Sequence, residues 1–122
     1  MVYVTEIKRE KTGHVSISDD VMAVIAGTAA LEAEGVMGLV GYYPGNSQKA
    51  VRKQMSKGVV VVVKDGTARA SLSITARFGA KLCEVAKDVQ KRVKKEVENM
   101  TGLVLSEVNV TVAKIVGEYK KA

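Results

Sequence analysis

The sequence holds few of the residues that most often build chemical sites. Its 122 residues include one cysteine, one proline, one histidine, one phenylalanine, four tyrosines and no tryptophan. The lone cysteine, Cys83, excludes an internal disulfide. The lone histidine, His14, has no second histidine with which to hold a metal ion. So few aromatic side chains provide no evident platform on which nucleic-acid bases could stack.

The sequence also lacks the segments that carry a chain into or across a membrane. Residues 1–11 are mixed in charge and have no apolar core of the kind found in signal peptides. The longest apolar run, residues 21–31, is too short to span a bilayer. Together with the unpaired cysteine, these absences predict a soluble protein in a reducing, cytoplasmic compartment.

No stretch matches a motif for catalysis or cofactor binding. There is no phosphate-binding loop, dinucleotide fingerprint or cysteine framework for a metal. Neighbouring helical side chains diverge, so Asp19 and Asp20 do not converge on one substrate atom. Glu32 and Glu34 follow a helix end, where negative charge is unfavourable, and hint at a cation from another segment or chain. We expect no catalytic residues, no cofactor and no metal, and we rank an enzyme last among the functions considered.

What is present is the composition of one ordered domain. The chain is 47% hydrophobic and 26% charged, and its length suits a single core. We divide it into three parts. Residues 1–12 are a flexible or edge-strand segment, residues 13–116 a single α+β domain, and residues 117–122 a polar tail.

A long amphipathic helix over residues 80–100 organises this domain. Its apolar side chains recur at steps of three and four residues: Leu82, Val85, Ala86, Val89, Val93, Val97 and Met100. Because valine is a middling helix former, the burial of these side chains, and not their intrinsic helix propensity, must stabilise this helix. Gly102 is suited to end it in the left-handed conformation.

A slimmer helix is predicted over residues 19–33. Ser18 is a good N-cap for it, and the two aspartates that follow suit the positive end of the helix dipole. The residues that recur at helical spacing are Val21, Val24, Ile25, Thr28, Ala29 and Leu31 or Glu32. Its many alanines favour close packing on a sheet or on the longer helix.

The strands are clearest in the middle of the chain. Residues 59–63 are five valines, typical of a strand buried on both faces or nearly so. Asp65-Gly66 signals a type I′ hairpin turn. Apolar and polar residues alternate over residues 68–78, and further strands are expected near residues 15–17, 36–43 and 108–116. The predicted fold is α+β: a mixed sheet of about four strands, with two main helices on one face and a short basic helix or loop at 46–57.

The net charge of +6 is unevenly distributed. Residues 14–46 contain no lysine or arginine, whereas residues 47–57 contain Lys49, Arg52, Lys53 and Lys57 and no acid. This basic segment could bind the phosphates of nucleic acid or an anionic lipid surface. It could equally be a solvated helix face.

The valine strand also suggests self-association. With both helices on one face of the sheet, about half of the valine run would face water. We expect a homo-oligomer to cover this patch, with Val59, Val61 and Val63 at the contact and Arg69 and Arg77 at its rim. The N-terminal Val2 and Val4 are the competing cover.

Several blocks, read in order, resemble one known family. They are Gly13-His-Val-Ser-Ile-Ser18, Val24-Ile-Ala-Gly-Thr-Ala-Ala-Leu-Glu-Ala-Glu-Gly-Val-Met-Gly38, the strand that follows Lys57, Val89-Gln-Lys-Arg-Val-Lys-Lys-Glu-Val-Glu-Asn-Met-Thr-Gly102 and Glu107-Val-Asn-Val110. Over residues 13 to 116 the chain is similar to the alkaline-shock, or general-stress, proteins of Gram-positive and related bacteria. Phe78-Gly79 stands at the family's usual aromatic-glycine pair, whereas Ala80-Lys81-Leu82 departs from its more polar helix start.

The resemblance implies a small, non-enzymatic cytoplasmic protein with no catalytic residues to transfer. Some members are held at the membrane by a separate anchor protein and linked to envelope stress; others are linked to fatty-acid metabolism or have no assigned role. The first hypothesis is therefore an envelope-related interaction or scaffold protein, acting as a homo-oligomer and through protein partners such as a membrane anchor. The alternative is a nucleic-acid-binding module that uses the basic segment.

Overall fold

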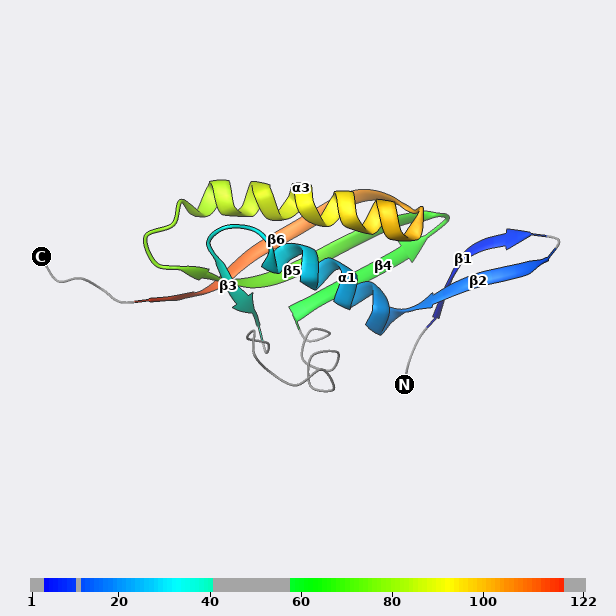
Figure 1. The fold of residues 1–122 in the computed structure, drawn as a ribbon, viewed down its shortest axis with the longest axis horizontal. Helices are drawn as coiled ribbons and strands as arrows, with labels where there is room; N and C mark the ends of the chain where they lie inside the picture. Colours follow the sequence, from blue (N-terminus) through cyan, green and yellow to red (C-terminus); the bar gives the residue numbers. More distant parts are fainter. Residues whose placement is uncertain (1–3, 11, 41–57, 118–122) are drawn as a thin grey trace, which may run out of the picture.

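The computed structural model describes residues 4–10, 12–40 and 58–117. In chain order these form β1 (Val4–Glu10), β2 (Gly13–Ser18), α1 (Asp19–Leu31), β3 (Val36–Leu39), β4 (Val59–Lys64), β5 (Thr67–Arg77), α3 (Leu82–Thr101) and β6 (Val104–Val116). Helices α1 and α3 pack against each other on one face of a four-stranded sheet, and β1 and β2 form a separate hairpin (Figure 1). The predicted α+β fold, with a mixed sheet and both helices on one face, is confirmed. The helix or loop expected at 46–57 lies outside the described residues.

Strand β5 is the centre of the sheet. β6 runs parallel along one of its edges, while β3 and β4 both pair antiparallel with it. Because β6 occupies one edge over the full length of β5, β3 and β4 must share the other edge, end to end. The amide of Val40 donates to the carbonyl oxygen of Ser73 at 3.0 Å, between the two paired stretches. β3 and β4 are thus two halves of one interrupted edge strand.

Gly58 lies where these two halves meet. A Cβ atom on Gly58 would lie 2.8 Å from the carbonyl oxygen of Val40, which is closer than real Cβ contacts allow. A glycine at this position lets the chain re-enter the sheet beside the point where it left.

The turn between β4 and β5 fixes which valines face the helices. Asp65 and Gly66 have φ values of 52° and 76°, as a type I′ turn requires. This two-residue turn pairs Val63 with Ala68 and Val61 with Ala70, on the face that the helices cover. Because side chains alternate along a strand, the other valines of β4 point to the opposite face.

The core side of α3 is a row of residues four positions apart. Val85, Val89, Val93 and Val97 are buried as predicted, and the next member of the row is Thr101. Met100 was expected in this stripe, but its side chain is 63% exposed. With 3.6 residues per turn, Thr101 lies about 40° forward of Val97 around the helix, whereas Met100 lies about 60° back, so Met100 leaves the buried row. Gly102, with φ of 74°, caps the helix as expected.

The buried face of α1 matches the predicted one only in part: Ala29 is buried, and Val24 and Ile25 are half-buried against the core. Ser18 is the N-cap, as expected, since its Oγ accepts from the amide of Val21 at 3.2 Å. The buried residues are small apart from one methionine: Met22, Ala23, Ala26, Gly27, Ala29 and Ala30. The expected Val21 and Thr28 are exposed, because a face of alanine and glycine lets α1 approach α3 and the sheet more closely. The helix ends at Leu31, two residues earlier than predicted.

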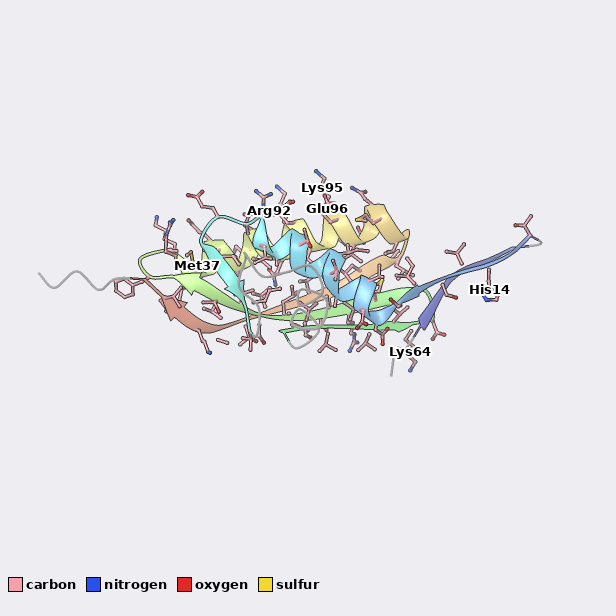
Figure 2. The ribbon with its side chains drawn as sticks, turned by 60° about the horizontal axis from the view of Figure 1, so that its bottom comes forward. His14, Met37, Lys64, Arg92, Lys95 and Glu96 are labelled. Atoms are coloured by element: carbon pink, nitrogen blue, oxygen red, sulfur yellow. The ribbon has the colours of Figure 1, made fainter. Side chains whose placement is uncertain are left out.

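The described part of the N-terminal segment pairs within its own hairpin. β1 is antiparallel to β2, with Thr5 opposite Ile17, and the hairpin projects beyond the N-terminal end of α1 (Figures 1 and 2). Residues 4–10 therefore form a strand, and they do not lie over the uncovered face of the sheet. The backbone at Val4 thus belongs to the hairpin, and Val2, the other residue of the competing cover, lies outside the described residues.

Candidate interaction surfaces

The face of the sheet opposite the helices, called here the open face, carries three exposed valines. Val104 of β6, opposite Thr67 of β5, is 59% exposed. Val60 and Val62 are 55% and 57% exposed. They stand opposite Ser71 and Arg69 of β5, so each is flanked by a polar side chain. Lys64 of the same row projects from the side of the sheet away from α3 (Figure 2). The open face is thus a polar surface with a small apolar centre on β4.

The structure corrects the valines that were expected at this surface. Val59 is buried, Val61 and Val63 are half-buried, and all three pack against the helix-covered core. The hairpin turn directs the other alternate valines of β4 away from the helices, so Val60 and Val62 are the valines of this strand that are available for contact. Arg69 and Arg77 are exposed on β5, as expected for the rim.

The open face is mainly basic among its described charges. The register places Lys64, Arg69, Arg77 and Lys114 on this face, with Glu107 as the acid. Arg69 Nε lies 3.7 Å from Glu107 Oε2, and both side chains are well exposed. Such a pair contributes about 1 kcal/mol at most. Two copies of this surface would therefore repel each other at low salt unless the contact is confined to the valines.

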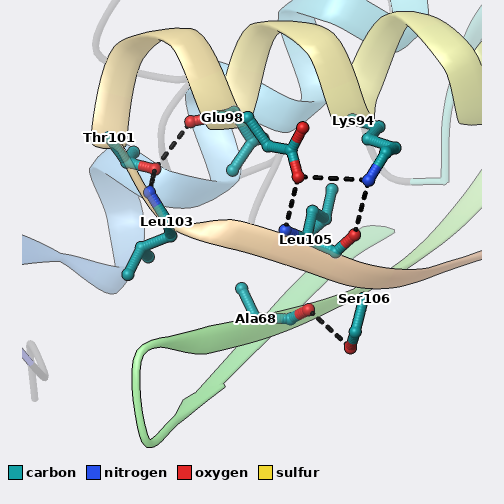
Figure 3. A network of polar contacts seen from close by, with 8 residues as sticks. Ala68, Lys94, Glu98, Thr101, Leu103, Leu105 and Ser106 are labelled. Carbon is teal, nitrogen blue, oxygen red and sulfur yellow. Dashed lines mark hydrogen bonds and ion pairs between the residues drawn. The ribbon is translucent and has the colours of Figure 1, made fainter.

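A polar network joins the C-terminal part of α3 to the start of β6 (Figure 3). Glu98 Oε2 accepts from the amide of Leu105 at 2.9 Å and from Lys94 Nζ at 3.1 Å. Lys94 Nζ also donates to the carbonyl oxygen of Leu105 at 3.1 Å. The bond from the Leu105 amide, followed by the bond from Lys94, lowers the pKa of Glu98 below its usual value. The network holds the two backbone groups of Leu105 with side chains of α3.

Thr101 closes the turn between the same two elements. Its hydroxyl donates to the carbonyl oxygen of Val97 at 2.6 Å and accepts from the amide of Leu103 at 3.2 Å (Figure 3). Because the hydroxyl is satisfied on both sides, Thr101 can be buried at the end of the valine row.

A shallow groove of about 480 Å³ runs between α3 and β6, and we call it the α3–β6 groove. Its helix wall consists of Lys87, Gln90, Lys91 and Lys94, and its floor is residues 105–108 of β6. Gln90 Nε2 donates to the carbonyl oxygen of Val108 at 2.9 Å. The groove therefore combines a row of lysines with the outer backbone edge of a strand.

The acids at the end of α1 face cations from other elements. Glu34 lines a groove with Arg77 and Lys81, and Glu32 lines another with Arg92 and Lys95. The cation inferred from the sequence thus has candidates within the chain, although no ion pair joins these groups within the described ranges.

The other candidate residues form no site in the described part of the chain. Lys49, Arg52, Lys53 and Lys57 lie outside it. Cys83 is exposed at the start of α3, and His14 is exposed in β2. Residues 4–10, 12–40 and 58–117 hold no cluster of three or more potential metal ligands. Within the same ranges, neither helix is long and apolar enough to cross a membrane.

Comparison with known proteins decides the family. A model of the alkaline-shock protein 23 family, described as having a cell envelope-related function, matches residues 7–117. The chain belongs to this family. The match confirms the resemblance to alkaline-shock proteins, and it includes most of the β1–β2 hairpin.

Curated relatives cover nearly the whole chain. An uncharacterized protein of Streptococcus pyogenes serotype M6, Spy1614, is 38% identical over 113 residues, which are 88% of this chain and 93% of the relative. Bacillus subtilis YloU, also uncharacterized, is 32% identical over 107 residues, or 85% and 89% of the two chains. B. subtilis YqhY, likewise uncharacterized, is 32% identical over 104 residues, or 84% and 77%. No solved structure matches the chain.

Sequence reasoning missed two features of these surfaces. The parity of Val60 and Val62 could have been found, because a two-residue turn at Asp65-Gly66 pairs Val63 with Ala68, a residue of the apolar face. The α3–β6 groove could not have been found by periodicity, since it depends on which side of α3 meets β6.

Proposed function

We propose that this chain is a non-enzymatic interaction or scaffold protein of the cell envelope. It works through self-association and protein partners, at the inner face of the membrane and through an anchor protein. The family's cell envelope-related function supports the setting. The observation that carries the self-association is the pair of exposed valines, Val60 and Val62, that β4 presents on the open face.

The location of the helices supports a second copy as the cover. Both described helices lie on the opposite face of the sheet, and residues 4–10 are committed to the β1–β2 hairpin. Because the open face has four basic side chains and one acid, the contact should centre on β4 with the arginines at its rim. Salt should then strengthen association by screening the repulsion.

Sedimentation velocity over a range of protein and salt concentrations tests this proposal. The wild-type protein should form dimers or larger species, more so as salt increases. Val60→Ser with Val62→Ser should shift the protein toward monomer. A matched control, Val15→Ser with Val21→Ser, removes two exposed valines elsewhere and should leave association unchanged. A wild-type monomer at high micromolar concentration in all salts would refute self-association.

The nucleic-acid-binding alternative rests on the uninterrupted basic segment containing Lys49, Arg52, Lys53 and Lys57. It makes the opposite salt prediction, because phosphate binding weakens as counterions accumulate.

A further inference from the structure

The outer edge of β6 has an open stretch next to the α3–β6 groove. The amide of Phe78 donates to the carbonyl oxygen of Val116, whereas the amide of Arg77 donates to Gly35 on the other side of β5. Backbone groups of successive residues in a strand point to opposite sides, and these two bonds show which residues of β5 and β6 point toward each other. In that alternation the backbone groups of Leu105, Val108, Val110 and Val112 point away from β5.

Side chains of α3 satisfy only the first part of this outward row. Glu98 and Lys94 bond both backbone groups of Leu105, and Gln90 bonds the carbonyl of Val108. Among the described residues, no side chain or strand bonds the outward groups of Val110 and Val112. These groups can pair with an added strand.

The wall above this edge is basic. Lys87, Lys91 and Lys94 line the groove, and the acid beside them, Glu107, is paired with Arg69 on the open face. Lys94 is engaged by Glu98, but Lys87 and Lys91 have no ion pair within the described ranges. A strand lying along β6 would place alternate side chains beneath these lysines.

We propose that the α3–β6 groove binds an extended acidic peptide of a partner protein, which adds as a strand to the edge of β6. Backbone hydrogen bonds to Val110 and Val112 supply affinity, and carboxylates beneath Lys87 and Lys91 supply selectivity. The proposal rests on the proposed scaffold function, since it names one class of partner, but it uses a different surface from the open face.

The charges of residues 1–13 and 117–122 argue against either stretch as the occupant. Residues 1–13 contain three basic and two acidic residues, and residues 117–122 contain two lysines and one glutamate. Neither stretch complements a wall of lysines, which favours a peptide of a different protein.

Fluorescence anisotropy with a labelled peptide of alternating glutamate and valine tests the proposal on the full chain. The wild-type protein should bind this peptide, and the same peptide with lysine for glutamate should not bind. A version with N-methylated backbone amides keeps the charge but loses the strand hydrogen bonds, and it should also fail to bind. Equal binding of the N-methylated peptide would overturn strand addition.

Charge reversal on α3 locates the site. Lys87→Glu with Lys91→Glu should weaken binding about tenfold, the effect expected of two lost exposed ion pairs. Lys81→Glu at the N-cap of α3, with Lys95→Glu on the helix, changes the net charge equally but away from the groove, and it should have little effect. Equal losses in both double variants would show that net charge alone attracts the peptide.

Amide chemical shifts identify the contacted strand and the occupant. Peptide addition should shift the amides of Val110 and Val112 and leave those of Val60 and Val62 unchanged, whether or not the protein self-associates. Shifts at Val110 that depend on protein concentration without peptide would assign the edge to a second copy and overturn the proposal. So would a single-stranded DNA oligonucleotide that binds the same lysines more tightly than the peptide.

Discussion

At the residue scale, the stability of the domain depends on a few fully enclosed side chains. Val89, Val93 and Val97 have no exposed surface, and Ala68 and Ala70 of β5, in the same core, are equally buried. With small partners on the sheet, there is little room for a larger or charged group.

Replacing Val93 with aspartate should unfold the domain or nearly so. The carboxylate would be buried without a partner, which costs several kcal/mol against a typical domain stability of about 5–15 kcal/mol. Thermal unfolding followed by circular dichroism measures the loss. Lys95→Asp, on the outer side of α3 in Figure 2, should change the melting temperature little. Equal melting temperatures for the two variants would contradict the orientation of α3.

Glu98 makes stability depend on pH in one direction. Its pKa is lowered in the folded protein from the ordinary value of 4.5, so the folded state favours the charged carboxylate. Its contribution is fully present above the unfolded pKa and is lost as the pH falls through the folded pKa.

Glu98→Gln should therefore lower the melting temperature most near neutral pH and least in acid. The measurement is the difference in melting temperature between wild type and variant at about pH 7 and about pH 3. Glu96→Gln, on the opposite side of α3 from β6, should leave the wild-type pH dependence in place. A Glu98→Gln deficit that does not shrink in acid would show that the lowered pKa has no effect on stability.

At the scale of elements, the interrupted edge strand explains how one sheet accommodates a long insertion. β3 and β4 continue each other along β5, so residues 41–57 can connect their facing ends without altering the register on either side. Val40 and Gly58, the described residues on either side of this segment, therefore lie next to each other at one edge of the sheet.

Charge reversal at Arg52 and Lys53 tests the basic segment directly. If it binds phosphate, wild-type protein should be retained on anionic liposomes or nucleic acid at low salt, and retention should fall steeply as salt is added. Arg52→Glu with Lys53→Glu should abolish retention. If wild-type protein is retained on neither ligand at low salt, the basic segment does not bind phosphate and is only a solvated face.

At the scale of the whole molecule, self-association should raise thermal stability with concentration. A dimer that forms only from folded chains stabilises them by mass action. The melting temperature of the wild-type protein should therefore increase with protein concentration, and more clearly at higher salt. Val60→Ser with Val62→Ser should make it independent of concentration. A concentration-independent wild type would argue against the open face as an interface.

The sequence by itself determined the elements that depend on local patterns. The four-residue spacing of valines placed α3, Ser18 placed the start of α1, and Asp65-Gly66 placed the β4–β5 hairpin. Helix period, capping and turn geometry act over a few residues, so the sequence displays them directly.

Only the tertiary structure decided what depends on residues far apart in the chain. The alanine face of α1 is buried because α3 and the sheet meet it there, and β3 and β4 share an edge because β6 takes the other. The lysines of α3 line the edge of β6 because the connection after Gly102 brings that strand beneath them. The local pattern of a helix or strand does not determine which of its faces is buried, because that depends on packing between segments far apart in the chain. The same packing determines which side chains form the open face and the α3–β6 groove.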